Sequence, residues 1–160
     1  MGMSKTPEKT NVCRLLDAKK VPYTEHTYPP EEALSGVEVA EYLHQDPDRV
    51  FKTLVTEGAS GAYYVFVIPV SGELNLKKAA AAVHEKSIRM IPQKELFPLT
   101  GYVHGGCSPI GMKKAFPTVF DFTAELFDTV CFSAGKIGFQ VECSFQDLLS
   151  RFPFSSEDLT

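Results

Sequence analysis

The stretch TVFDFTAELFDTVCFSAGKIGFQVE, residues 118–142, decides the fold. Its three strand candidates, separated only by turns, are residues 118–122, 129–132 and 137–142. Apolar residues alternate in the last candidate, where Ile137, Phe139 and Val141 share one face of the expected strand. Strands that follow one another without intervening helices exclude a pure βαβ repeat, so the sequence predicts an α+β fold.

Further strands are expected upstream of this stretch. Segment 62–70 is almost continuously apolar and rich in aromatic and β-branched residues, which indicates a strand buried on both faces. The other upstream strand candidates are residues 23–28, 51–57 and 88–91.

Helices are predicted where a capping residue precedes an apolar stripe. The predicted starts are Thr6 with Pro7, the capping box of Ser35 with Glu38, Asn75, and Ser144 with Asp147. We expect the helix after Ser35 to run to residues 46–48, and a short helix at 92–97.

Together these elements predict a mixed, barrel-like sheet of six to seven strands, surrounded by about four to five helices. The 160 residues suit a single domain, 1–160. We expect the ends of the chain, residues 1–6 and 155–160, to be flexible.

Composition and charge exclude several classes of protein. The 44% hydrophobic and 22% charged content is that of a soluble globular protein, and no apolar run approaches the roughly 20 residues of a membrane span. The N-terminal segment MGMSKTPEKT lacks the apolar region of a signal peptide. A net charge of −4 disfavours a protein that coats DNA. We therefore expect a cytoplasmic protein with no membrane partner.

The cysteines and histidines do not form a recognisable metal or redox motif. The four cysteines are separated by 94, 24 and 12 positions, so no CxxC pair exists. His26, His44 and His84 are spread over different elements, and none of the three has metal-ligand spacing to another histidine or to a cysteine. We expect free thiols, no metal and no cofactor.

The glycine-rich segment GGCSPIG, residues 105–111, is a candidate functional loop. Its backbone N–H groups could converge on an oxyanion, or the loop could simply connect two strands. Cys107 would need a base to act as a nucleophile, and His104 has no orienting carboxylate nearby in the sequence. We therefore do not assign Cys107 a nucleophilic role.

Two further polar positions invite a functional or a structural interpretation. Lys52 lies inside an apolar strand, so its ammonium either reaches water at a sheet edge or serves a polar cavity. Ser133 begins a turn of small residues, 133–136, where its hydroxyl could face a pocket or merely close a hairpin.

Basic residues are concentrated between positions 76 and 114, a window with a net charge of +5. Such a window is typical of a phosphate-binding face, although a set of unrelated solvated lysines would give the same count. The basic residues of the window are Lys77, Lys78, Lys86, Arg89, Lys94, Lys113 and Lys114, against the acidic Glu85 and Glu95.

Five motifs in order, between about residues 12 and 150, resemble the YbaK (Cys-tRNA(Pro) deacylase) family. They are HTY at 26–28, FKTLV at 51–55, LNLKKAA at 74–80, GY at 101–102 with GGxSPxGxKK at 105–114, and SxGKxG at 133–138. The FKTL-like motif and the glycine-proline loop also occur in the wider editing superfamily, which includes the editing insertion of bacterial prolyl-tRNA synthetases. The strings LNLKKAA and GGxSPxGxKK indicate YbaK more narrowly.

The resemblance implies a mixed barrel ringed by helices and a trans-editing activity. It implies removal of cysteine from Cys-tRNA(Pro), with Cys-tRNA(Cys) as a further substrate, by attack of the substrate's own thiol on its ester to form a cyclic thiolactone. The implied partners are mischarged tRNA(Pro) and prolyl-tRNA synthetase in a transient complex, and the expected state is a monomer. An Ala-tRNA(Pro) deacylase and a non-catalytic module that binds tRNA or the synthetase remain alternatives.

The resemblance also implies roles for individual residues. Lys52 would anchor a phosphate or the 3′-terminal hydroxyl, or polarise the carbonyl, and the backbone around Gly106 would stabilise the oxyanion. Cys107 stands at a variable position that often carries an aliphatic residue. The implied substrate-binding residues are Tyr28, Thr53, Ser108, Pro109, Ser133 and Gly135, and the implied tRNA-binding residues are Lys77, Lys78, Lys113, Lys114 and Lys136.

Overall fold

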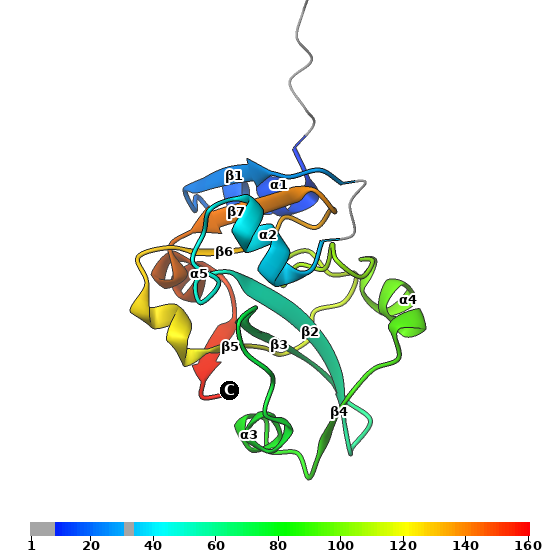
Figure 1. Ribbon diagram of the computed structural model, residues 1–160. Helices are drawn as coiled ribbons and strands as arrows, with labels where there is room; N and C mark the ends of the chain where they lie inside the picture. The colour runs from blue at the N-terminus through cyan, green and yellow to red at the C-terminus, as the bar shows by residue number, and fades with distance from the viewer. Residues whose placement is uncertain (1–8, 31–33) are drawn as a thin grey trace, which may run out of the picture.

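The computed structural model describes residues 9–30 and 34–160. Figure 1 shows α1 and β1 at one end of the folded molecule and α3 at the opposite end. The elements are α1 (Asn11–Ala18), β1 (Tyr23–Thr27), α2 (Gly36–Tyr42), β2 (Phe51–Gly58), β3 (Tyr63–Pro69), α3 (Leu76–Ala82), β4 (Ile88–Met90), η1 (Gln93–Glu95), α4 (Leu96–Thr100), β5 (Thr118–Asp121), η2 (Phe122–Leu126), β6 (Val130–Ser133), β7 (Phe139–Cys143), α5 (Phe145–Arg151) and β8 (Phe154–Glu157).

The strands form two sheets, in the orders β1-β7-β6 and β4-β2-β3-β5-β8. β5 pairs in parallel with β3 and β8, whereas the other pairs are antiparallel. A bridge between Val50 and Cys131 joins the start of β2 to β6, so the two sheets are linked at that point. The predicted mixed α+β architecture is confirmed, with the strands divided between two bridged sheets and one strand more than the predicted maximum.

β3 is buried on both faces, as its apolar sequence predicts. Val65 and Val67 face the core that is shared with the smaller sheet, and Phe66 and Ile68 face a second core beneath α3. All four side chains are fully buried. The strand is central because β2 pairs with one of its edges and β5 with the other.

Phe120 of β5 lies at the centre of the main core. Its ring centroid lies 6.2 Å from Phe51 of β2, 6.4 Å from Phe132 of β6, 5.0 Å from Phe145 of α5 and 5.3 Å from Phe154 of β8. Aromatic pairs at such separations add about 0.5–1.5 kcal/mol each beyond the burial of their surface. The segment that opens residues 118–142 therefore joins both sheets and α5.

Three predicted helix caps are confirmed, and the boundaries of two helices differ from the prediction. Asn75, Ser35 and Ser144 each accept hydrogen bonds from the first turn of the helix that follows. α1 begins after Thr10, whose hydroxyl accepts the Cys13 N–H, whereas the predicted start at residues 6–7 lies outside the described residues. No helix among residues 9–30 and 34–160 has both the length and the apolarity to cross a membrane.

α2 ends earlier than the sequence predicts. Its last residue is Tyr42 and not the segment 46–48, because His44 takes a positive φ of 56° and turns the chain. The early end leaves α2 as a short helix packed through Val39 and Ala40, beside the loop that leads into β2.

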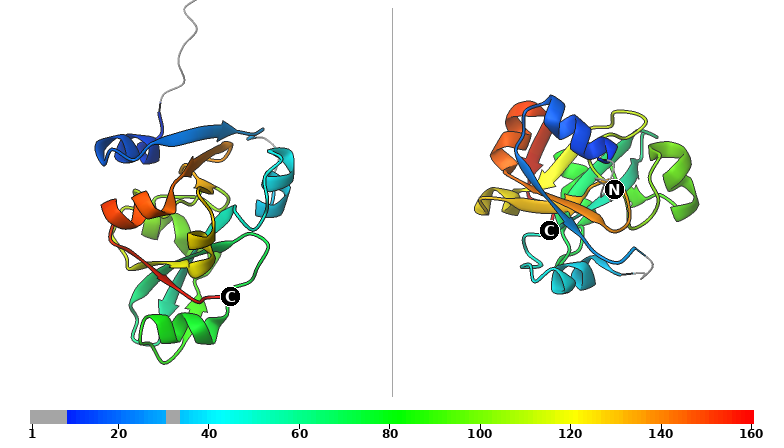
Figure 2. Two further views of the ribbon diagram at one scale, coloured as in Figure 1. Left: turned by 90° about the vertical axis from the view of Figure 1, so that its left-hand side faces the viewer. Right: turned by 90° about the horizontal axis from the view of Figure 1, so that it is seen from above.

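The C-terminal tail was expected to be frayed, and that expectation is wrong. Residues Phe154–Glu157 form β8 and pair with β5. Leu159 is fully buried, and its backbone N–H donates to the Asp121 carboxylate at 2.8 Å. Figure 2 shows the C-terminus lying against the body of the protein. Burial of one leucine and the strand hydrogen bonds outweigh the polar composition of the tail.

Candidate functional site

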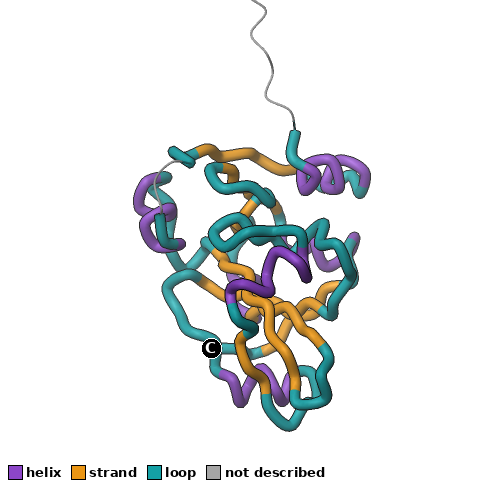
Figure 3. The backbone as a smooth tube through the Cα atoms, turned by 90° about the vertical axis from the view of Figure 1, so that its right-hand side faces the viewer, coloured by secondary structure: helices purple, strands orange, loops and turns teal. Residues whose placement is uncertain are grey.

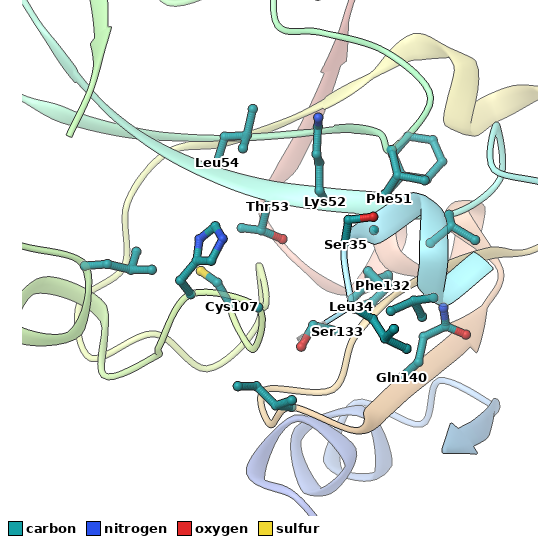
Figure 4. A pocket seen from close by; sticks show the side chains of 18 of the residues that line it. Leu34, Ser35, Phe51, Lys52, Thr53, Leu54, Cys107, Phe132, Ser133 and Gln140 are labelled. Atoms are coloured by element: carbon teal, nitrogen blue, oxygen red, sulfur yellow. The ribbon is translucent and has the colours of Figure 1, made fainter. Parts of the chain in front are cut away.

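A cavity of about 790 Å³ lies between the two sheets and is bordered by segments from much of the chain. The bordering residues come from the segment after β1, from helix α2 and the residues just before it, from β2 and Val50 before it, and from Val70 after β3. The others come from the segment between β4 and α4, from the loop that follows α4, and from β6, β7 and the turn between them. Figure 4 shows the side chains of many of the residues that border this space. Most of them are apolar, including Leu34, Val39, Leu54, Phe132 and Ile137.

Four of the predicted site residues border this cavity: Tyr28, Lys52, Thr53 and Ser133. They come from three segments that are far apart in the sequence. The backbone N–H of Tyr28 donates to Gly138 O at 2.9 Å, which holds the end of β1 against the β6–β7 turn. The fold therefore gathers these residues around one space.

Lys52 and Thr53 are consecutive in β2 and leave the strand on opposite sides. In Figure 4 the Lys52 ammonium points away from Cys107 and Ser133, whereas the Thr53 hydroxyl points toward the interior of the cavity. Alternation along a strand requires this arrangement. The Lys52 ammonium is thus separated from the inner groups of the cavity, and Lys52 lies at its border.

The Thr53 hydroxyl has no hydrogen-bond partner in the part of the chain that the structure describes. Its Oγ1 atom is buried and unpaired among the described residues. A buried hydroxyl without a partner is uncommon and costs free energy, so such a group is available to a ligand.

Ser133 is held by the turn that follows it. Its Oγ accepts the Gly135 N–H at 3.1 Å. Gly135 has a φ of +90°, and an added Cβ would lie 3.0 Å from both Tyr102 and Val12. Gly135 is not among the residues that border the cavity, in contrast to its predicted role in binding substrate, and it acts by shaping the turn that carries Ser133.

Residues 101–117, between α4 and β5, contain no helix or strand and appear as a loop in Figure 3. Within this loop, His104, Gly105 and Cys107 border the cavity, whereas Gly106 is not among the bordering residues. The Gly106 N–H, predicted to stabilise an oxyanion, donates to Val103 O at 3.0 Å.

Ser108 and Pro109 do not border the main cavity, in contrast to their predicted roles in binding substrate. Ser108 is fully buried, and its Oγ accepts the Ile110 N–H at 3.3 Å. Pro109 lines a second, smaller cavity of about 170 Å³. Both residues therefore stabilise the loop on the side that faces away from the main cavity.

Cys107 borders the cavity but does not present a thiolate. Burial raises the pKa of its thiol to about 12, so the thiol is protonated at neutral pH. His104 also borders the cavity, but no hydrogen bond joins it to Cys107 or Ser133 among the described residues. The described residues that border the cavity therefore include no activated nucleophile of the Cys–His or Ser–His kind.

The predicted tRNA-binding lysines fall into separate groups. Lys77 and Lys78 are on α3, where Lys78 pairs with Asp158 at 2.9 Å. Lys113 donates to Pro98 O at 3.4 Å, and Lys136 lies over the Phe139 ring at 5.5 Å from its centroid. Lys114 lines the smaller cavity. The charged window of the sequence is thus divided between α3 and the loop beside the cavity.

Five polar residues that border the cavity were not predicted as site residues: Ser35, Glu38, Gln93, His104 and Gln140. Gln140 is 2% exposed and exchanges two side-chain hydrogen bonds with Gln45, at 2.7 and 3.0 Å. A polar residue between the apolar Phe139 and Val141 was the available signal for it. Glu38 gave no separate signal, because its capping box already explains its position.

Comparison with known proteins identifies the family. A model of the aminoacyl-tRNA editing domain matches residues 30–150. A protein of Enterococcus faecalis named "Putative Cys-tRNA(Pro)/Cys-tRNA(Cys) deacylase EbsC" is 45% identical over 151 residues, which are 94% of this chain and 92% of that protein. A proline–tRNA ligase of Shouchella clausii is 29% identical over 108 residues, and the match covers 68% of this chain but 19% of the ligase.

Solved structures share the fold at low sequence identity. The crystal structure of "hypothetical protein APE2540" superposes with a TM-score of 0.84 at 22% identity, covering 95% of this chain and 99% of that one. That of "a putative trans-editing enzyme for prolyl tRNA synthetase" has a TM-score of 0.78 at 23% identity, covering 98% and 99%. With the match to the family model and the relative of 45% identity, these findings give one conclusion: the chain belongs to the aminoacyl-tRNA editing domain family.

Proposed function

We propose that this protein is a trans-editing deacylase that removes cysteine from Cys-tRNA(Pro), and that Cys-tRNA(Cys) is a further substrate. The name of the Enterococcus faecalis relative, which is 45% identical along nearly its whole length, supports this substrate. The observation that carries the proposal is the cavity itself. It gathers Tyr28, Thr53 and Ser133 but offers a protonated Cys107 thiol in place of a reactive nucleophile.

A cavity without an activated nucleophile suits a substrate that carries its own. The cysteinyl thiol attacks the ester carbonyl, which forms a carbon–sulfur bond and breaks the bond to the ribose oxygen. The thiol proton ends on the released ribose hydroxyl, and the aminoacyl group leaves as a cyclic thiolactone. Because nucleophile and electrophile belong to one molecule, the protein needs only to hold a reactive conformer and stabilise the oxyanion.

We propose different tasks for two neighbouring residues of β2, and their opposite directions support the division. The unpaired Thr53 hydroxyl, directed into the cavity, donates to the carbonyl oxygen or accepts from the thiol. Lys52 is directed away from the inner groups, so it anchors the 3′-terminal phosphate and does not polarise the carbonyl. In the free protein the Gly106 N–H donates to Val103 O. To stabilise the oxyanion, this N–H has to give up Val103 O and donate to the oxyanion in the reacting complex.

A panel of Cys-, Ala- and Pro-charged tRNA(Pro) tests the proposal directly. We expect rapid release of cysteine and slow release of alanine and proline, because alanine and proline lack the thiol. Release of alanine as fast as cysteine would replace the proposal with an alanine deacylase. Stable binding of Cys-tRNA(Pro) without cleavage would replace it with a non-catalytic binding module.

We also propose that the protein works in a transient complex with prolyl-tRNA synthetase. The net charge of −4 and the division of the lysines between α3 and the loop support weak binding of tRNA by the protein alone. Discrimination between Cys-tRNA(Pro) and Cys-tRNA(Cys) is expected to increase when the synthetase is added. An unchanged ratio of the two rates would count against the complex.

A further inference from the structure

Two fully charged side chains border the cavity among the described residues: Lys52 on β2 and Glu38 on α2. The substrate class proposed above also carries two opposite charges close together. Its 3′-terminal phosphate is negative, and the α-amino group of the aminoacyl ester is positive when protonated. The proposed partner of Lys52 is the phosphate, whereas the proposed reaction assigns no substrate group to Glu38.

The Glu38 carboxylate is held in a fixed orientation by the capping box of α2. One carboxylate oxygen, Oε1, accepts the Ser35 N–H at 2.9 Å, while the Ser35 hydroxyl accepts the Glu38 N–H at 3.2 Å. The hydrogen bond from the Ser35 backbone, followed by that from its side chain, lowers the pKa of Glu38 below its usual value. The carboxylate is therefore ionised at neutral pH, and its second oxygen has no partner among the described residues.

We propose that Glu38 binds the α-ammonium group of the aminoacyl ester. This inference rests on the proposed deacylase function and specifies which form of the substrate the cavity accepts. A preorganised carboxylate favours an ammonium group because neither partner has to be ordered anew on binding. The cavity consequently selects aminoacyl-tRNA with a free amine and discriminates against N-acylated forms such as peptidyl-tRNA.

The substitution Glu38→Gln tests this role without removing the cap. Glutamine at this position of a capping box can still accept the Ser35 N–H, so α2 keeps its start while the negative charge is lost. Glu41→Gln is the matched control, because Glu41 is an exposed acid on the same helix that does not border the cavity. Thermal unfolding should give the same midpoint for all three proteins within about 2 °C.

The measurement compares Cys-tRNA(Pro) with N-acetyl-Cys-tRNA(Pro). We expect wild type and Glu41→Gln to prefer the free amine in kcat/KM by about twofold to fivefold, as a charge pair with the exposed Glu38 carboxylate allows. Glu38→Gln should lose that preference by cleaving the free-amine substrate more slowly, with little change for the acetylated one. A loss of fold or cap would instead slow both substrates together.

A binding assay separates failure of this inference from failure of the proposed function. The probe is S-methylcysteine in amide linkage to 3′-amino-3′-deoxyadenosine, which cannot react, and its N-acetyl form. Tighter binding of the free amine to wild type than to Glu38→Gln supports the inference, even if no Cys-tRNA(Pro) is cleaved. Equal dissociation constants for the two proteins, or no preference of wild type for the free amine, overturns it, even if cleavage is fast.

Discussion

Two walls of the cavity are built in different ways. β2 pairs with β3 along most of its length and with β4 near its end, so a ladder of hydrogen bonds fixes the backbone of Lys52 and Thr53. The loop at residues 101–111 has no strand partner. It is held by local bonds such as Gly106 N–H to Val103 O and by the Tyr102 hydroxyl, which donates to Ile110 O.

The difference indicates what each wall contributes. β2 presents side chains whose direction is set by the pleat, so it supplies specific groups to the substrate. The loop presents backbone and small residues in conformations that need glycine, with a φ of +87° at Gly105 and +82° at Gly111. Substitutions of Lys52 and Thr53, the polar β2 residues that border the cavity, should therefore change the chemistry with little loss of stability, whereas substitutions in the loop should change the shape of the site.

The largest expected effect is that of Lys52→Ala. Loss of a charged hydrogen bond to phosphate corresponds to about 1.5–3 kcal/mol, so kcat/KM for Cys-tRNA(Pro) should fall by about 10- to 100-fold. Stability should change little, because Lys52 is not part of either core. Lys52→Arg should restore part of the activity, and Lys86→Ala, an exposed lysine away from the cavity, should retain all of it. Full activity of Lys52→Ala would show that Lys52 does not bind the substrate.

Gly106→Ala tests the loop wall. The new Cβ would lie 3.1 Å from Ile137 N and 3.4 Å from Ile137 Cγ1, so the loop must move away from the β6–β7 turn. We expect a loss of about 1 kcal/mol in the free energy of unfolding and a fall in activity of about tenfold. Gly72→Ala is the control, since its Cβ would make only ordinary contacts of 3.6 Å or more. Unchanged activity in Gly106→Ala would show that the shape of the loop is not critical.

Thr53→Val should separate stability from activity in the β2 wall. The substitution removes a buried hydroxyl that has no partner, so the free energy of unfolding should stay the same or rise by up to about 1 kcal/mol. Activity should nevertheless fall by about fivefold, because the substrate loses a hydrogen bond.

Thr56→Val in the same strand is the matched comparison for Thr53→Val. The Thr56 hydroxyl is buried and donates to Tyr64 O at 2.9 Å. Its removal leaves that bond unmade, so the protein should be destabilised by about 1 kcal/mol while activity is retained. Chemical denaturation measures the first quantity and release of cysteine the second. Destabilisation of Thr53→Val as large as that of Thr56→Val would indicate that its hydroxyl is paired after all.

The fold was predictable where local signals and tertiary packing agree. The continuous apolar run in β3 indicated a central strand, and Ser35, Asn75 and Ser144 marked the starts of helices, because capping depends on only a few neighbouring residues. The tail was not predictable in the same way. Its strand exists because β5 offers an open edge and because Leu159 fills a site in the second core, and both depend on residues far away in the sequence.

The site was predictable for side chains on strands and less so for the loop. Family motifs selected Tyr28, Lys52, Thr53 and Ser133, and all four border the cavity. The same motifs do not distinguish residues that face the cavity from residues that support it. Cys107 borders the cavity, whereas the next residue, Ser108, does not border it and is fully buried, although both belong to one motif.

The smallest expected effect is that of Cys107→Ala, which examines whether the loop contributes any side chain to the reaction. Cys107 borders the cavity, but burial keeps the pKa of its thiol at about 12, so it should act neither as nucleophile nor as base at neutral pH. Activity of Cys107→Ala toward Cys-tRNA(Pro) should stay within about twofold of wild type. Wild type should also react slowly with iodoacetamide at pH 7 at this position, as mass spectrometry of the modified peptide can determine. A fall in activity of 100-fold or more in Cys107→Ala would show that the Cys107 thiol takes part in the reaction. The proposed difference between the two walls, in which β2 supplies side chains and the loop supplies shape, would then be wrong.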